Sequence, residues 1–181
     1  MKTIEIELYK IDELAGQALA KALDKLREAT EFDHAFMTEE FHGVLEALGF
    51  TGIECRFNSF GSQGDGASFT AHYAYNIDWL EDLGFEDADL IAIGTELEKL
   101  RIRSAEIMAS GRYCHSGTMD VEVIEGDTAL EDGLLTEARC LADRYYRQLE
   151  IDYNYQFSDD TLMESARANG LEFTADGEIW S

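Results

Sequence analysis

The sequence has 181 residues, the size of one ordinary domain, and its 45% apolar content is enough for a hydrophobic core, which excludes a wholly disordered acidic chain. Its 14 Lys and Arg stand against 38 Asp and Glu, and the net charge of −24 argues against direct binding of DNA or RNA. The sequence has no apolar run long enough to span a membrane and no apolar stretch typical of a secretory leader. It also has no proline, and thus no proline-rich linker. We therefore expect one cytoplasmic domain over residues 1–181.

The first third of the chain predicts a strand followed by two helices. Residues 2–9 alternate between apolar and polar, as a half-buried strand does. Apolar residues then recur at helical spacing over residues 12–30 and again over residues 36–48. Gly49 follows the second helix and can take the left-handed conformation of a C-cap.

The middle of the chain predicts a β-hairpin. Residues 53–57 and 69–75 alternate in polarity, and three glycines mark the loop at residues 61–66 between them. A phosphate-binding loop would lead into a helix, whereas this loop joins two strands and carries Asp65, which would repel phosphate. We therefore interpret it as a structural turn, with a contact loop for a partner as the alternative.

The second half of the chain predicts more helices and a second hairpin. Together with the elements above, these predict an α+β fold: an antiparallel sheet built from two hairpins plus terminal strands, with amphipathic helices packed on it. The expected elements are a helix over 88–109, hairpin strands over 112–115 and 119–125, a helix over 135–149, a short helix capped by Ser158 and a strand over 171–173.

No group of residues carries a recognisable catalytic or metal-binding spacing. The four histidines contain no H-E-x-x-H motif, and pairs of carboxylates mean little among 38 acids. Cys55, Cys114 and Cys140 lack metal-ligand spacing and predict buried, reduced thiols. We expect a protein without catalytic residues, metal or cofactor.

The distribution of charge is more informative than any motif. Lys and Arg are absent between Arg56 and Lys99, and again over residues 113–138, so each window should form an acidic patch. Carboxylates roughly 5–7 Å apart can imitate part of the field of DNA, which carries one charge per about 1.7 Å. The alternative is a solvated surface that only confers solubility. The predicted partner-binding residues are Asp65 and an acidic run without a nearby cation, namely Asp78, Glu81, Asp82, Glu86, Asp87 and Asp89.

Five segments spread along most of the chain are distinctive when taken together. They are Tyr9-x-x-Asp12-Glu13-Leu14, the hairpin from Phe60 to Phe69, Tyr113-x-His115-Ser116, Arg147-Gln148-Leu149-Glu150 with Tyr153 and Tyr155, and Glu172-Phe173-Thr174-x-Asp176-Gly177. In this order they resemble a group of small acidic phage-encoded proteins that genome pipelines often label as antitoxins of toxin–antitoxin systems. The resemblance brings no catalytic residues.

The resemblance implies a function for the acidic surface. Phages use small acidic proteins in the host cytoplasm to block defence proteins whose basic grooves hold nucleic acid. We therefore expect a non-enzymatic inhibitor of anti-CRISPR or antirestriction type, with a basic host protein or nuclease complex as its partner. One alternative is an antitoxin-like protein that neutralises a basic toxin. Another is a small-ligand binding protein or enzyme that uses the hairpin at Gly61–Gly66. Unpaired sheet edges would permit a homodimer.

Overall fold

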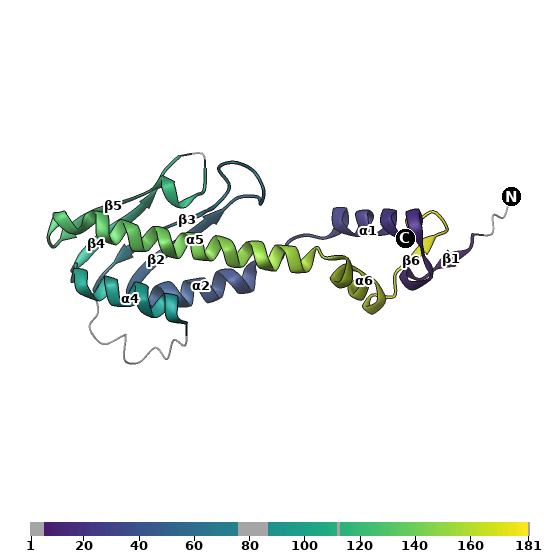
Figure 1. Cartoon of the computed structure of the whole chain (residues 1–181), viewed down its shortest axis with the longest axis horizontal. Coiled ribbons are helices and arrows are strands. Elements are labelled where there is room, and N and C mark those ends of the chain that lie inside the picture. The colour runs from purple at the N-terminus through teal and green to yellow at the C-terminus, as the bar shows by residue number, and fades with distance from the viewer. Residues whose placement is uncertain (1–5, 76–86, 112, 181) are drawn as a thin grey trace. The chain divides into compact units, whose positions relative to one another are not determined.

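A computed structural model describes residues 6–75, 87–111 and 113–180, which are coloured in Figure 1. Contacts between residues divide the chain into two compact units. The expectation of one domain over residues 1–181 stays a prediction. The second boundary between the units falls inside the long helix α5 (Glu131–Gln156). We call them the central unit, His34–Glu150, and the terminal unit, Met1–Asp33 with Ile151–Ser181.

The central unit contains a four-stranded antiparallel sheet in which each strand pairs with its neighbour in sequence. The first hairpin is the predicted one, and Phe57 pairs with Ala67 at its loop end. Phe69 and Tyr73 point to the inner face and are fully buried. The strands in sheet order are β2 (Phe50–Phe57), β3 (Ala67–Tyr73), β4 (Ser104–Ala109) and β5 (Met119–Glu125).

Helices α2 (Ala35–Ala47), α4 (Ala88–Leu100) and α5 pack on one face of this sheet, as Figure 1 shows. Phe41 of α2 stacks on Tyr145 of α5, with ring centroids 4.3 Å apart. The same Phe41 meets Phe69 of β3 edge to face at 5.8 Å. Aromatic burial of this kind anchors both helices to the sheet.

The predicted helix over residues 88–109 is wrong beyond Leu100. There α4 ends, Arg101 takes the left-handed conformation with φ 51°, and the chain continues into β4. Pairing with β3 on one side and β5 on the other stabilises this strand over a longer helix. The second hairpin is therefore β4–β5, and residues 113–115, predicted as part of a strand, belong to its connection.

The terminal unit has a small sheet of its own, in the order β1-β6-β7, so the prediction that the terminal strands join the main sheet is wrong. Its core includes Leu23 and Leu26 of α1, Leu162 of α6 and Phe173 of β6. Two sheets with packed helices confirm the α+β class. The elements are β1 (Leu8–Tyr9), the 3-10 turn η1 (Ile11–Glu13), α1 (Gly16–Ala29), α6 (Asp159–Ala168), β6 (Glu172–Thr174) and β7 (Ile179–Trp180).

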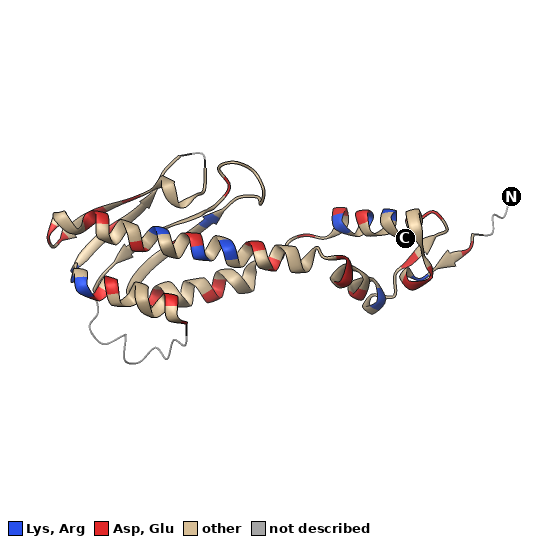
Figure 2. Ribbon diagram, viewed as in Figure 1, with Lys and Arg blue, Asp and Glu red and all other residues tan. Residues whose placement is uncertain are grey.

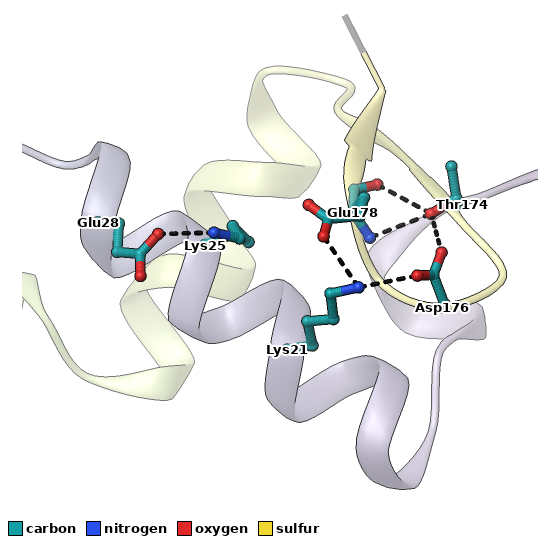
Figure 3. A network of polar contacts seen from close by, with 6 residues as sticks. All are labelled: Lys21, Lys25, Glu28, Thr174, Asp176 and Glu178. Atoms are coloured by element: carbon teal, nitrogen blue, oxygen red, sulfur yellow. Dashed lines mark hydrogen bonds and ion pairs between the residues drawn. The ribbon is translucent and has the colours of Figure 1, made fainter.

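The turn between β6 and β7 is fixed to α1 by a network of polar contacts (Figure 3). Lys21 of α1 donates to Asp176 at 2.8 Å and pairs with Glu178 at 2.9 Å. Thr174 donates its hydroxyl to Asp176 at 2.6 Å. Gly177, at φ +86°, has no room for a side chain, because a Cβ there would lie 2.1 Å from the backbone oxygen of Ala18.

Candidate functional site

The central sheet has one face against the helices and one face exposed to solvent. Along β5, Met119, Val121 and Val123 are buried, whereas Asp120 and Glu122 between them are exposed. A strand shows this alternation when only one face of its sheet is covered. The solvent-facing side carries five carboxylates that we call the acidic face, namely Glu54, Glu106, Asp120, Glu122 and Glu125.

One row of residues crosses all four strands of this face. Thr51 lies opposite His72, and His72 lies opposite Glu106. Glu106 in turn lies opposite Glu122. Directly opposed residues of an antiparallel pair have Cβ atoms about 4.5–5.5 Å apart, so two carboxylates in this register destabilise the sheet.

Cations compensate only part of the charge on the acidic face. With His72 neutral, two arginines against five carboxylates give 2 − 5 = −3. Asp120 and Glu122 form no ion pair with any residue that the structure describes. Exposed ion pairs contribute little stability. The pairs present are Arg56–Glu54 at 3.5 Å, Arg103–Glu125 at 3.0 Å and the contact of His72 Nδ1 with Glu106 at 3.1 Å.

Both edges of the sheet carry features that oppose pairing with another strand. On β5, the N–H of Val121 donates to its neighbour Asp120 at 2.9 Å, and the N–H of Val123 donates to Glu131 at 3.1 Å. On β2, the register is interrupted between Thr51 and Glu54 by a bulge. Capped N–H groups and bulges both hinder edge-to-edge association. The face of the sheet is therefore a better docking surface than its edges, and the homodimer stays a prediction.

The acidic run predicted as the main partner site is only partly described, and it has a cation beside it. Asp87 caps α4 by accepting from the N–H groups of Asp89 at 3.0 Å and Leu90 at 3.2 Å. Arg144 of α5 also donates to Asp87, which corrects the expectation of a run without a nearby cation. Asp78, Glu81, Asp82 and Glu86 lie outside the described residues.

The protonation of Asp87 reflects these contacts. Burial would raise the pKa of Asp87, but the N–H groups of Leu90 and Asp89 and the charge of Arg144 outweigh that effect and lower the pKa. The carboxylate is thus held ionised as a helix cap and an ion-pair partner. Asp87 therefore has a structural role, and Asp89 is the exposed member of the described pair.

Asp65 and the glycine-rich loop form a closed turn. The Asp65 carboxylate accepts from the N–H of Ser62 at 2.6 Å. The N–H of Gly66 donates to the Asn58 side chain at 3.1 Å, and the N–H of Asn58 donates to the Gly66 oxygen at 3.2 Å. These bonds occupy the Asp65 carboxylate and the N–H groups of Ser62 and Gly66, which favours the structural-turn interpretation of residues 61–66.

The same loop is packed against α5. Phe60 stacks on Tyr146 with ring centroids 5.3 Å apart, and the Tyr146 hydroxyl donates to the Ser59 oxygen at 3.2 Å. A Cβ on Gly66 would lie 2.5 Å from the Cβ of His115, so this glycine is required by close packing. The loop is therefore part of the scaffold of the central unit.

The described part of the chain contains no group of three or more His, Cys, Asp or Glu side chains placed to hold a metal ion. No helix within it is both long enough and apolar enough to cross a bilayer. The prediction of buried thiols is wrong for Cys140, which is exposed on α5, and Cys55 and Cys114 are only partly buried. This partial burial raises the pKa of the Cys55 thiol to about 12.

Comparison with known proteins places the central unit in a family. The family described as a domain of unknown function, DUF8835, matches residues 34–159. The chain belongs to the DUF8835 family. No curated protein and no solved structure matches it.

The DUF8835 match covers the whole central unit and thus the whole acidic face. Most of the terminal unit, including α1 and its sheet, lies outside the matched residues. In the central unit, 23 Asp and Glu stand against 8 Lys and Arg, and Figure 2 shows acidic positions in red along its helices. The part of this chain that matches DUF8835 therefore carries a large excess of acidic side chains.

Sequence reasoning found part of the acidic face. Asp120, Glu122 and Glu125 fall in the second window without Lys or Arg. The alternation of Asp120 and Glu122 with Val121 and Val123 predicts that these two carboxylates are exposed. Glu106 falls within the predicted helix over residues 88–109, so the sequence does not predict its position opposite Glu122. Glu54 lies outside both windows without Lys or Arg.

Proposed function

We propose that the chain is a non-enzymatic binding protein whose acidic face engages a Lys- and Arg-rich surface on a protein that otherwise holds nucleic acid. The opposition of Glu106 and Glu122 carries this proposal. Two facing carboxylates lower the stability of the sheet. Glu106 contacts His72, but Glu122 has no ion-pair partner within the described residues. Departures from the rules of stable folding concentrate where a protein binds or reacts.

The spacing of the acidic face suits a basic partner. Neighbouring strands lie about 4.8 Å apart and alternate residues along a strand about 6.7 Å apart, so the carboxylates form a grid over the sheet. Arg and Lys side chains that bind phosphates can pair with such a grid, and Arg does so through two parallel hydrogen bonds. The charge of the whole central unit would also steer a basic partner toward it.

The resemblance to small phage-encoded proteins narrows the proposal. It supports an inhibitor of a host defence nuclease, of anti-CRISPR or antirestriction type, that competes with nucleic acid for a basic groove. An antitoxin would use the same acidic face against a small basic toxin. The identity of the captured protein separates these two outcomes.

Capture of the partner with matched variants tests the proposal. The tagged full chain is expressed in bacteria with an active defence nuclease, and the bound protein is then challenged with duplex DNA. We expect a nucleic-acid-binding protein that DNA displaces. The face variant should lose this protein, and a control with three equivalent exposed acids replaced on the helices should keep it. The face variant is Glu54→Gln, Glu106→Gln and Glu122→Gln, and the control variant is Glu39→Gln, Glu46→Gln and Asp143→Asn.

Two results would contradict this proposal. A captured protein that DNA does not displace would remove the competition with nucleic acid from the proposal. Equal capture by the face variant and the control variant would exclude the acidic face as the binding surface. Both variants keep the size of the replaced side chains and should fold, because exposed substitutions change stability by about 0.5 kcal/mol or less.

A further inference from the structure

A pocket of about 240 Å³ opens among the helices of the central unit, on the side of the sheet that faces away from the acidic face. Its floor is apolar and its polar groups come from α2 and α5. At about 20–30 Å³ for each non-hydrogen atom, it has room for a ligand of about ten such atoms. The lining residues are Glu40, Phe41 and Val44 of α2, Leu90 of α4, and Arg144 and Gln148 of α5.

The α5 side of the pocket presents hydrogen-bond donors. The Arg144 side chain is only 24% exposed and is held in place by Asp87. A guanidinium carries five N–H donors. Within the described residues Arg144 uses one of its groups for a hydrogen bond, because its nearest approach to Asp89 is 3.9 Å. Gln148, one helical turn further on, adds a side-chain amide with no hydrogen bond to any described residue.

The α2 side of the pocket presents an acceptor. Glu40 is exposed and forms no ion pair with any residue that the structure describes. The apolar lining residues are Phe41 and Leu90, which are almost wholly buried, and Val44, which is partly exposed. The pocket thus offers one carboxylate from one helix, and a guanidinium and an amide from another.

We propose that this pocket binds a free α-amino acid with an apolar side chain. The ligand carboxylate accepts from Arg144 and Gln148, its ammonium group donates to Glu40, and its side chain packs on the apolar floor. Leucine, with nine non-hydrogen atoms, is close to the roughly ten that the pocket can hold. This site goes beyond the proposed function, since it shares no residue with the acidic face.

The charges around the pocket favour a zwitterion over simpler ligands. Asp87, Asp89 and Glu40 outnumber Arg144, so a small anion such as phosphate would meet net repulsion. A simple amine would satisfy Glu40 but leave the donors of Arg144 and Gln148 without a partner. A ligand with both charges satisfies both walls of the pocket.

Calorimetric titration of the full chain with three probes tests this proposal. The probes are L-leucine, L-leucinamide, which lacks the carboxylate, and 4-methylpentanoate, which lacks the ammonium group. We expect saturable binding of leucine, with each of the other two at least tenfold weaker. Glu40→Gln should weaken leucine binding at least tenfold, and Glu39→Gln, one residue away but outside the pocket lining, should leave it unchanged.

Three results would overturn the proposal. The absence of saturable leucine binding up to about 10 mM would exclude a site of useful affinity. Leucinamide binding as tight as that of leucine would show that the ligand carboxylate is not recognised by Arg144. Equal leucine binding by Glu40→Gln and Glu39→Gln would place any binding outside this pocket. The face variant should bind leucine normally, so failure of the proposed function and failure of this pocket are distinguishable.

Discussion

Glu106 of β4 lies directly opposite Glu122 of β5, and His72 of β3 contacts Glu106 from the other side at 3.1 Å. The two carboxylates face each other on the solvent-exposed side of the central sheet. His72 is the neighbour of Glu106 in the row, and Glu122 has no ion-pair partner within the described residues. The repulsion between Glu106 and Glu122 lowers the stability of the sheet, and both residues belong to the acidic face that we propose as the binding surface.

Replacing Glu122 with Lys should stabilise the central unit. A lysine opposite Glu106 turns a repulsive pair into an attractive one, with an expected gain of about 0.2–1 kcal/mol. Glu39→Lys on α2 makes the same change in net charge away from the sheet and serves as the control. Urea denaturation of both variants measures the effect. A Glu122→Lys variant no more stable than Glu39→Lys would show that the facing carboxylates carry no cost.

Asp87→Ala should destabilise the central unit more than Asp87→Asn. Alanine removes both the N-cap of α4 and the partner of Arg144, and loss of a cap alone costs about 1 kcal/mol. Asparagine keeps a cap oxygen and loses only the charge. Unfolding by urea compares the two variants with the unmodified chain. Equal stability of the two variants would mean that the cap contributes nothing measurable.

The sequence predicts most of the central unit because its signals there are local. The C-cap at Gly49 has φ +90°, and β5 alternates as its valines and acids predict. The error over residues 88–109 arises because a short apolar stretch after a helix reads equally as more helix or as a strand. Only pairing with β3 and β5 decides the outcome, and sequence spacing does not contain that information.

Contacts between distant residues account for the other differences from prediction. Arg144 and Asp87 are 57 residues apart, so the cation beside the acidic run has no local signal. The terminal strands are also distant from each other, as Tyr9 pairs with Phe173. Their alternation predicts strands, but it does not predict that they form a sheet of their own.

Gly177→Ala should destabilise the terminal unit much more than Gly170→Ala. Both glycines have positive φ, which costs an alanine about 1–2 kcal/mol. At Gly177 a Cβ would also lie 2.1 Å from the Ala18 oxygen, whereas at Gly170 nothing lies within 4 Å. We expect a loss at least twice as large for Gly177→Ala in urea denaturation. Similar losses would contradict the close packing of the turn on α1.

The carboxylate of Asp176 should titrate well below an ordinary aspartate. Hydrogen bonds from Lys21 and Thr174 lower its pKa to about 2. Because the folded-state pKa is depressed, these contacts stabilise the fold above the unfolded pKa of about 3.9, and that contribution is lost as the pH falls through the folded value. NMR titration of the carboxyl carbon measures the midpoint directly.

Variants of two neighbouring lysines provide the control for this titration. Lys21→Gln should raise the midpoint of Asp176 toward its ordinary value. Lys25→Gln should leave it unchanged, because Lys25 pairs with Glu28 in Figure 3. A midpoint that does not respond to Lys21→Gln would assign the low pKa to another cause.

The dissociation constant of the captured partner, measured from about 0.1 M to 1 M salt, tests the central claim most directly. Over this range the Debye length falls from about 10 Å to 3 Å. If the acidic face meets Lys and Arg that otherwise hold phosphates, the unmodified chain should lose at least about tenfold in affinity. The face variant should bind more weakly at low salt and respond less to added salt. An affinity independent of salt, and equal for the unmodified chain and the face variant, would contradict the claim.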